Sequence, residues 1–189
     1  MNRDTSRPDL EAIARSAEGA GRPLPPVHLW NPARSGEIDI VIRPDGRWYH
    51  EGGLIGREAL VRLFSTILRR DDDGFWLVTP VEKLRIVVED APFVAVRVDR
   101  TPRGDLRFTT NVGDEVIAGP GHALRVETDP VTKEPRPYVH VRRGLEALIA
   151  RPVFYELAEL AESGRTPEGE GLYVTSGGER YLIGELEGA

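Results

Sequence analysis

The sequence predicts an α+β protein made of two related modules, each an antiparallel sheet with a helix. Short strand-like stretches are interrupted twice by longer amphipathic segments, which gives blocks in the order sheet, helix, sheet, helix. Two stretches about ninety residues apart also carry similar residue types in the same order. His50 precedes Phe64 by fourteen residues, and His140 precedes Phe154 by the same spacing. Identity between the two stretches is low, so an internal duplication competes with chance similarity.

The N-terminal half contains two predicted helices around a hairpin. Residues 8–19 place apolar side chains at helical spacing, and residues 19–26 break the pattern with glycine and proline. We expect a short docking helix followed by a tether. Residues 37–42 carry isoleucine on one face and pair with residues 47–50 as a hairpin. The apolar stripe of residues 57–70 predicts a helix that covers a small sheet.

The rest of the chain consists mainly of predicted strands joined by Pro- or Gly-containing turns, which favours antiparallel pairing. Residues 145–163 are an exception, since they predict a second helix whose main segment is started or kinked by Pro152. A final hairpin closes around Ser176, Gly177 and Gly178. The expected strands are residues 75–79, 84–88, 93–98, 106–112, 123–127, 138–141, 172–174 and 181–183.

Composition limits the chemistry that the chain can carry out. The 189 residues include no cysteine, which excludes disulfides, thiolate nucleophiles and cysteine-ligated metals. The 4 histidines lack the spacing of a local metal site, and no hydrolase, P-loop or Rossmann motif is present. The sequence therefore predicts no metal, no cofactor and no identifiable catalytic residue.

Charge and hydropathy indicate the cellular location of the protein and the classes of partner that it does not bind. A formal net charge of −6 and a pI near 5.3 argue against a nucleic-acid polymer as partner, because that affinity depends on Lys and Arg that neutralise phosphates. No apolar run is long enough to span a bilayer, and residues 1–22 lack the apolar segment of a secretory signal. We expect a cytoplasmic protein that binds neither a nucleic-acid polymer nor a membrane.

Several short motifs occur along the chain in a specific order and spacing: Leu-Trp-Asn-Pro at 29–32, Gly-Arg-Trp at 46–48, Leu-Phe-Ser at 63–65, Leu-Val-Thr-Pro-Val-Glu-Lys at 77–83, Val-Glu-Asp-Ala-Pro-Phe at 88–93, Thr-Asn at 110–111 and Pro-Tyr at 137–138. Over residues 25–185, these motifs resemble those of a proteobacterial family known as domain of unknown function 1285.

This resemblance implies a duplicated α+β core in two domains, the second similar to a pleckstrin-homology barrel. It also implies a cleft between the domains for a nucleotide-like ligand and a role in signal transduction, which rests on genomic context. We place a helix and tether at residues 1–24, the first module at 25–81 and the second at 82–189. The resemblance carries no catalytic residues with it.

Three cations are candidates for contacting a charged ligand. Arg57 and Arg151 each lie at the start of a predicted helix, where backbone N–H groups favour anions. Lys83 follows a predicted turn, where one of two neighbouring side chains faces a cleft and the other faces water. The alternative for all three is an ordinary solvated side chain or a surface ion pair.

Polar and aromatic side chains complete the candidate site. Thr79, Thr110 and Asn111 would supply hydrogen bonds to ribose or amide groups, although such residues also stabilise turns. Trp30 and Tyr138 would supply a flat apolar wall for a base, although each is also suited to the core.

Together these residues favour a non-enzymatic sensor or adaptor that holds a small anionic or nucleotide-like ligand at the domain junction. One alternative is a protein-interaction module, in which the second half binds a protein partner through a sheet edge or groove. The other is a hydrolase-type enzyme that uses His50 or His140 as general base near Glu82, on a small phosphorylated or carboxylated substrate.

Overall fold

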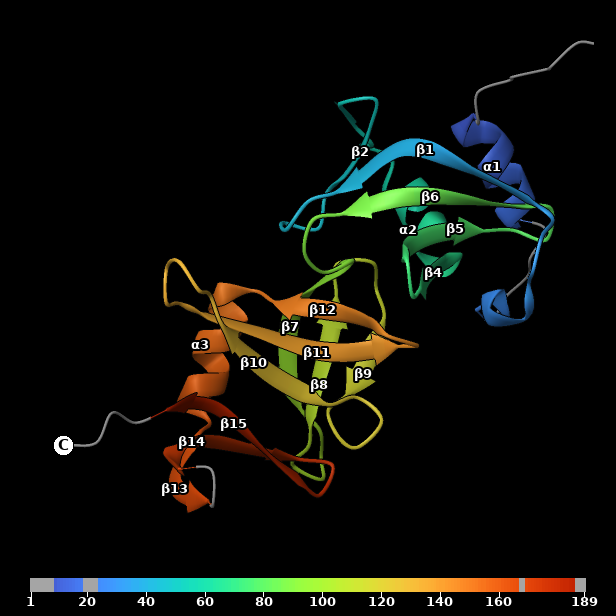
Figure 1. Cartoon of the computed structure of the whole chain (residues 1–189). Helices are drawn as coiled ribbons and strands as arrows, with labels where there is room; N and C mark the ends of the chain where they lie inside the picture. Colours follow the sequence, from blue (N-terminus) through green and yellow to red (C-terminus); the bar gives the residue numbers. More distant parts are fainter. Residues whose placement is uncertain (1–8, 19–23, 167–168, 186–189) are drawn as a thin grey trace, which may run out of the picture. The chain divides into compact units, whose positions relative to one another are not determined.

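A computed structural model describes residues 9–18, 24–166 and 169–185 and divides the chain into two units, Met1–Asp90 and Ala91–Ala189 (Figure 1). We call them unit 1 and unit 2. The sequence predicts a boundary between residues 81 and 82. The strand that follows this point pairs with two strands of unit 1, so the first unit extends to Asp90.

Unit 1 is a mixed sheet with two α-helices. The sheet has six strands in the order β3-β2-β1-β6-β5-β4. Its central pair, β1 and β6, is parallel and the other pairs are antiparallel, which corrects the all-antiparallel expectation. The elements are α1 (Leu10–Glu18), the 3-10 turn η1 (Val27–Leu29), β1 (Arg34–Ile42), β2 (Trp48–His50), β3 (Gly53–Leu54), α2 (Glu58–Thr66), β4 (Leu68–Asp71), β5 (Gly74–Val78) and β6 (Glu82–Val88).

The core of unit 1 follows the predicted periodicity. Ile40 and Ile42 of β1 are fully buried, and the predicted hairpin between β1 and β2 is confirmed. Phe64 of α2 is fully buried with its ring centroid 6.3 Å from that of Trp48. The predicted N-terminal helix is confirmed as α1, which packs against α2. The tether predicted at residues 19–26 lies partly outside the described residues.

The helix predicted over residues 57–70 is shorter than expected. It ends at Thr66, and the chain turns directly into β4. Leu68 pairs with Leu77 across the β4–β5 hairpin, so this leucine serves the sheet although it continues the helical apolar stripe. Helical spacing cannot reveal such a change because Leu68 is buried in either arrangement.

Unit 2 contains two sheets and one α-helix. The first sheet has the order β10-β11-β12-β7-β8-β9 and curls as a half-barrel (Figure 1), and the second has the order β13-β14-β15. Strands β12 and β7 pair in parallel. The elements are β7 (Phe93–Arg100), β8 (Leu106–Thr110), β9 (Glu115–Ile117), β10 (Leu124–Thr128), β11 (Pro135–Arg142), β12 (Leu145–Ile149), α3 (Arg151–Glu159), β13 (Glu162–Thr166), β14 (Gly169–Ser176) and β15 (Glu179–Glu185).

The prediction of helix over residues 145–163 is wrong at both ends. Leu145, Ala147 and Ile149 alternate into the core, so this part is strand β12. Pro152 lies in the first turn of α3, which confirms its expected role as a helix start. Residues 162–166 return to strand, since β13 pairs with β14.

The predicted C-terminal hairpin is confirmed as β14 and β15, and its tip is anchored within unit 2. Gly177 and Gly178 form the turn with φ of 60° and 79°. The buried Ser176 hydroxyl donates to the Ala118 carbonyl at 2.7 Å and accepts from the Leu106 N–H at 2.8 Å. These bonds attach the hairpin to the β8–β9 region.

Candidate ligand-binding site

Two of the predicted residues of unit 1 have partners that explain them locally. Arg57 occupies the N-cap position of α2 and forms a 2.9 Å ion pair with Glu11 of α1, with 70% of its side chain exposed. Thr79 is buried, and its hydroxyl accepts from the Glu82 N–H at 3.2 Å and donates to the Glu82 carbonyl at 3.1 Å. Thr79 therefore stabilises the β5–β6 turn.

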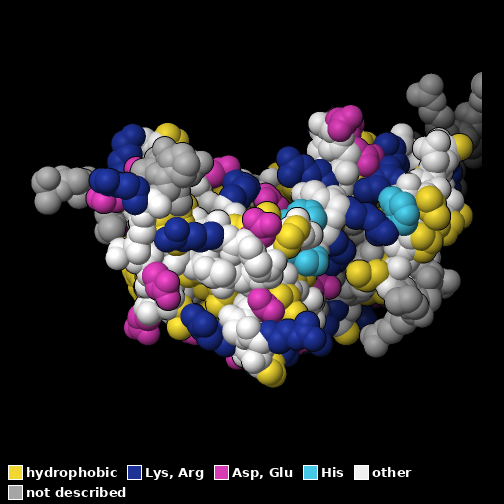
Figure 2. Space-filling model, turned by 90° about the horizontal axis from the view of Figure 1, so that it is seen from below, with side chains coloured by type: hydrophobic (Ala, Val, Ile, Leu, Met, Phe, Trp, Pro, Cys, Tyr) yellow, Lys and Arg dark blue, Asp and Glu magenta, His cyan; other side chains and the backbone are white. Residues whose placement is uncertain are grey.

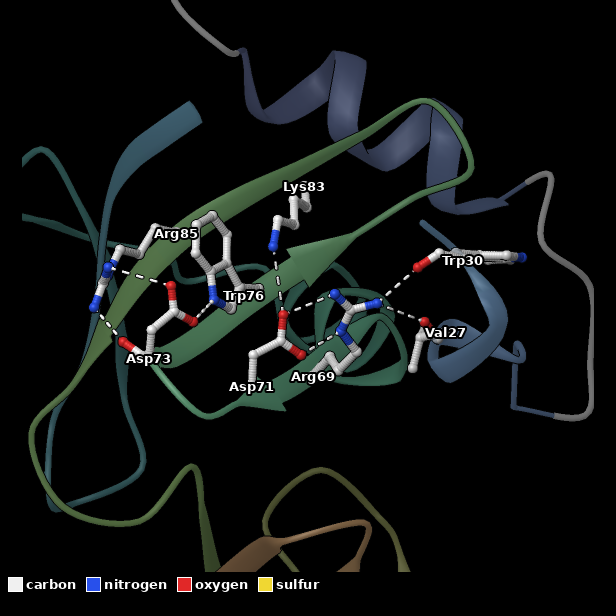
Figure 3. Close-up of polar contacts among 8 residues, drawn as sticks. All are labelled: Val27, Trp30, Arg69, Asp71, Asp73, Trp76, Lys83 and Arg85. Carbon is white, nitrogen blue, oxygen red and sulfur yellow. Dashed lines mark hydrogen bonds and ion pairs between the residues drawn. The ribbon is translucent and has the colours of Figure 1, made fainter. Parts of the chain in front are cut away.

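Lys83 and Trp30 belong to a polar network on unit 1 that is centred on Arg69 (Figure 3). The guanidinium of Arg69 donates to both carboxylate oxygens of Asp71, at 2.7 and 2.8 Å. It also donates to the backbone carbonyl of Trp30 at 2.8 Å and to that of Val27 at 3.0 Å. The Lys83 ammonium lies 3.5 Å from Asp71.

This Arg69 network ties the segment around η1 to the β4–β5–β6 edge of the sheet. The hydrogen bond from Arg69 lowers the pKa of Asp71, and the nearby charges of Arg69 and Lys83 add to the effect. The Lys83 ammonium also lies 4.2 Å from the centre of the Trp76 ring, whose indole N–H donates to Asp73 at 2.9 Å. Lys83 thus has both an anionic partner, Asp71, and an aromatic partner, Trp76, and these contacts match the ion-pair alternative raised by the sequence.

In unit 2, Thr110 and Asn111 form the turn between β8 and β9. The Thr110 hydroxyl accepts from the Asp114 N–H at 3.0 Å. Asn111 holds Val94 at the start of β7, because its side-chain oxygen accepts from the Val94 N–H at 2.9 Å and its own N–H donates to the Val94 carbonyl at 2.8 Å. These contacts match the turn alternative raised by the sequence.

Tyr138 is buried in β11 beneath a cation. The Arg125 guanidinium lies 4.2 Å from its ring centre and donates to both carboxylate oxygens of Glu146, at 2.7 and 2.6 Å. The hydrogen bond to Glu146 raises the pKa of Arg125 above its usual range, so this cation is permanent. One face of the tyrosine is therefore occupied by Arg125, while its hydroxyl accepts from Arg136 at 3.1 Å.

Arg151 lines a pocket of about 360 Å³. The pocket lies where β11 begins, β12 ends and α3 starts. Its lining consists of Asp129, Thr132, Glu134, Pro135, Arg136, Pro137, Leu148, Ile149, Arg151, Phe154 and Tyr155. We call this the α3 pocket. Its volume is in the range of small-molecule sites.

Two arginines and two carboxylates provide the charge of the α3 pocket. Arg151 pairs with Glu134 at 2.6 Å, and Arg136 pairs with Asp129 at 3.4 Å. The charge of Glu134 raises the pKa of Arg151, and the Tyr155 hydroxyl contributes to the same shift. The pKa of Asp129 is lowered chiefly by the N–H groups of Thr132 and Val131 that donate to it.

The start of α3 adds a partial positive charge at this pocket. Its N-cap residue is Ala150, which makes no side-chain capping bond. Pro152 in the first turn has no N–H, so the helix acts on the pocket through its dipole rather than through a row of free donors. A small anion bound here would meet the two guanidiniums beside the apolar side chains of Leu148, Ile149 and Phe154.

Sequence reasoning found Arg151 but missed Arg136, Asp129 and Glu134. The available signal was local: Arg136 stands between two prolines, and Asp129 precedes a proline in the expected hairpin loop. A proline-flanked arginine gives no indication of a pocket, because the pocket appears only when β11 and α3 pack together.

Within unit 1, the sheet register keeps His50 apart from Glu82, its partner in the enzyme alternative. His50 of β2 pairs with Ile40 of β1, and Glu82 of β6 pairs with Arg34 of β1. These positions are separated by about 20 Å along the strand, at roughly 3.3 Å per residue. In unit 2, His140 accepts at Nε2 from the Gly144 N–H at 3.0 Å, and its Nδ1 lies 2.9 Å from the Gly121 carbonyl. Both ring nitrogens thus engage the backbone.

The described part of the chain contains neither a metal-ligand cluster nor a membrane-spanning helix. Within residues 9–18, 24–166 and 169–185, no group of three His, Asp or Glu side chains gathers as metal ligands do. Over the same residues, no helix is long and apolar enough to cross a membrane.

The fold and the α3 pocket define a two-domain α+β protein with a ligand-sized site in its second domain. The chain belongs to the DUF1285 family. Residues 25–91 match the "Domain of unknown function (DUF1285), N-terminal domain" and residues 92–183 match the "Protein of unknown function (DUF1285), C-terminal domain". The family resemblance seen in the sequence is therefore confirmed.

Two solved structures support this assignment. A DUF1285 family protein from Silicibacter pomeroyi DSS-3 is 48% identical, with a TM-score of 0.86 over 96% of this chain and 97% of that one. A DUF1285 family protein from Shewanella baltica OS155 is 27% identical, with a TM-score of 0.52 over 64% of this chain and 90% of that one. No curated protein of known function matches the chain.

Proposed function

We propose that this protein is a cytoplasmic, non-enzymatic sensor or adaptor in signal transduction, which binds a small anionic or nucleotide-like ligand in the α3 pocket. The observation that carries the proposal is that Arg136 and Arg151, the first residue of α3, line one pocket together with Leu148, Ile149 and Phe154. Of the three cations predicted from the sequence, Arg151 is placed in a pocket within its own unit. The proposal therefore rests on unit 2 alone.

The ion pairs of the pocket are suited to exchange with a ligand. The side chains of Arg151 and Glu134 are 64% and 54% exposed, so their pairing contributes little in water. An incoming carboxylate or phosphate would replace Glu134 as the partner of Arg151. Arginine favours such groups because its planar fork binds two oxygens at once.

A nucleic-acid polymer is not the ligand that we propose. On the face seen in Figure 2, cationic and acidic side chains are interspersed, with apolar side chains between them. Polyanion binding needs several cations that act together on successive phosphates. A single small anion needs only the two arginines of the pocket.

The first test is thermal unfolding of the whole chain with nucleotides, cyclic dinucleotides, sugar phosphates and carboxylates. Ligand at about a hundred times its Kd should stabilise the protein by roughly 2.7 kcal/mol. The shift should disappear in Arg151→Ala and Arg136→Ala. Arg57→Ala is the matched control, since it also removes an arginine from a surface ion pair at a helix start. A flat panel in a cooperatively folded protein would overturn the proposal.

A protein-interaction module is the second candidate, favoured by two exposed apolar side chains. Val131 is 86% exposed in the loop that borders the α3 pocket, and Tyr155 of α3 is 58% exposed. Exposed tyrosine is common in protein interfaces. A purified partner that binds Arg151→Ala normally but fails to bind Val131→Asp would favour this function over the small-molecule sensor.

We also infer an internal duplication, supported by the order of elements. Unit 1 runs β1-β2-β3-α2-β4-β5-β6, and unit 2 runs β10-β11-β12-α3-β13-β14-β15 after its first three strands. In unit 1, β1 pairs with β6 within one sheet, and in unit 2 β10 contacts β15 of the second sheet. The curled sheet of unit 2 is the feature that favours a pleckstrin-homology-like description.

A further inference from the structure

A second pocket lies next to the α3 pocket. It has a volume of about 390 Å³ and shares Pro135 and Phe154 with the α3 pocket. The two spaces are therefore neighbours, with these two side chains in common. The remaining lining consists of Val126, Thr128, Lys133, Ala158, Leu172, Leu182, Ile183, Gly184 and Glu185. We call it the tail pocket.

The tail pocket and the α3 pocket differ in the charged side chains that line them. Strands β10, β14 and β15 contribute the aliphatic side chains Val126, Leu172, Leu182 and Ile183 to the tail pocket, and Ala158 adds a small apolar surface from α3. Its charged residues are Lys133 and Glu185, which are exposed. The two arginines, by contrast, lie in the α3 pocket. We call the two neighbouring pockets together the groove, which has both arginines at its α3-pocket end and Val126, Leu172, Leu182 and Ile183 at its other end.

We infer that the ligand is an anionic amphiphile, with a carboxylate or phosphate head at Arg136 and Arg151 and an unbranched apolar tail past Phe154 into the tail pocket. This inference rests on the proposed function, because it names the ligand class of the same site. Charge complementarity selects the head, and the aliphatic lining selects the tail. A nucleotide would place its polar sugar and base edges against Leu172, Leu182 and Ile183.

The length of the groove sets the length of the tail. From Arg151 to Ala158 the helix advances about 10 Å, at 1.5 Å per residue. With C–C bonds of about 1.5 Å at the tetrahedral angle, a chain of about eight carbons spans this distance. Burial of each methylene strengthens binding by about fourfold.

The test is a calorimetric titration of the whole protein with butanoate, hexanoate, octanoate and decanoate, below their micelle concentrations. Affinity should rise by up to about fourfold per methylene until the tail fills the groove at roughly eight carbons. Octan-1-ol, which has the tail without the charge, should bind more weakly than octanoate. Octyl phosphate distinguishes a phosphate head from a carboxylate head.

Two variants at one position separate the tail pocket from nonspecific adsorption. Ala158→Phe directs a large ring along α3 toward Phe154, since helical side chains point toward the N-terminus. It should abolish the dependence on chain length while butanoate binds as before. Ala158→Ser, which is close in size to alanine, should keep that dependence. Arg151→Ala should weaken every length by a similar factor.

The outcomes separate the two proposals. Equal affinity for all chain lengths would overturn the amphiphile and leave the anion site standing. Chain-length dependence that persists in Ala158→Phe would also overturn it, because the tails would then be adsorbing elsewhere. If no carboxylate or phosphate binds at any length, the proposed anion site itself is wrong.

Discussion

Replacing Arg69 by methionine should destabilise unit 1 by about 2 to 3 kcal/mol, on the scale of hydrogen bonds to charged groups. Methionine keeps much of the buried stem, so the change removes the guanidinium and leaves the packing largely intact. The lost contacts are two hydrogen bonds to Asp71 and two to the carbonyls of Val27 and Trp30. The side chain of Arg69 is only 15% exposed, so water replaces these contacts poorly.

The loss of stability in Arg69→Met should be larger at neutral pH than at acidic pH. The folded-state pKa of Asp71 is lowered mainly by the hydrogen bond from Arg69. A lowered carboxylate pKa contributes stability that is present above the unfolded value of about 3.9 and is lost as pH falls through the folded value. The difference in free energy of unfolding between wild type and Arg69→Met should therefore reach its full size at pH 7 and should shrink below about pH 4.

Urea unfolding at pH 7 and at a series of acidic pH values measures both effects. The control is Arg47→Met, because Arg47 forms a 3.7 Å pair with Asp45 and is 66% exposed. Its cost should stay within about 0.5 kcal/mol. If Arg69→Met costs no more than this control at pH 7, the Arg69 network does not hold the segment around η1 to the sheet.

Two further substitutions test how the C-terminal hairpin is anchored in unit 2, each by urea unfolding. Ser176→Ala removes the acceptor of the buried Leu106 N–H and the donor to Ala118, and should cost about 2 to 3 kcal/mol. Gly177→Ala should cost more than Gly178→Ala by about 1 to 3 kcal/mol, because both have positive φ but only a Cβ at 177 meets backbone, at 2.7 Å from the Ala118 carbonyl oxygen.

The hairpin predictions have their own controls. Ser163→Ala changes an exposed serine on the same sheet and should be nearly neutral. A Ser176→Ala protein as stable as Ser163→Ala would show that the hydroxyl does not anchor the hairpin. Equal costs at 177 and 178 would mean that left-handed backbone strain alone explains both, without the close approach to Ala118.

The candidate site shows which residues could be found from sequence. Arg151 was singled out because it lies at a helix start, and it does line a pocket. Thr79, Thr110 and Asn111 have the composition of turns; the hydrogen bonds of Thr79 and Thr110 are turn contacts, whereas Asn111 bonds to Val94 of β7. Small polar residues suit turns and ligand sites equally, so composition cannot separate the two roles.

The helix errors share a physical origin. Leu68 and Leu145 extend the apolar patterns of their neighbours, yet each is paired in a strand. Burial satisfies an apolar side chain in a helix or in a strand. The choice depended on whether another strand, β5 for Leu68 and β11 for Leu145, was available to bond the backbone.

The sequence by itself determined the fold class, the family, the two-domain organisation and most of the hairpins, because periodicity and turn chemistry are local properties. Only the tertiary structure decided the parallel pairs β1–β6 and β7–β12 and the extent of unit 1, since partners far apart in the chain leave no local signature. The α3 pocket has the same origin. Arg136 and Arg151 share a cavity because β11 and the start of α3 converge in space, and no spacing along the chain encodes that meeting.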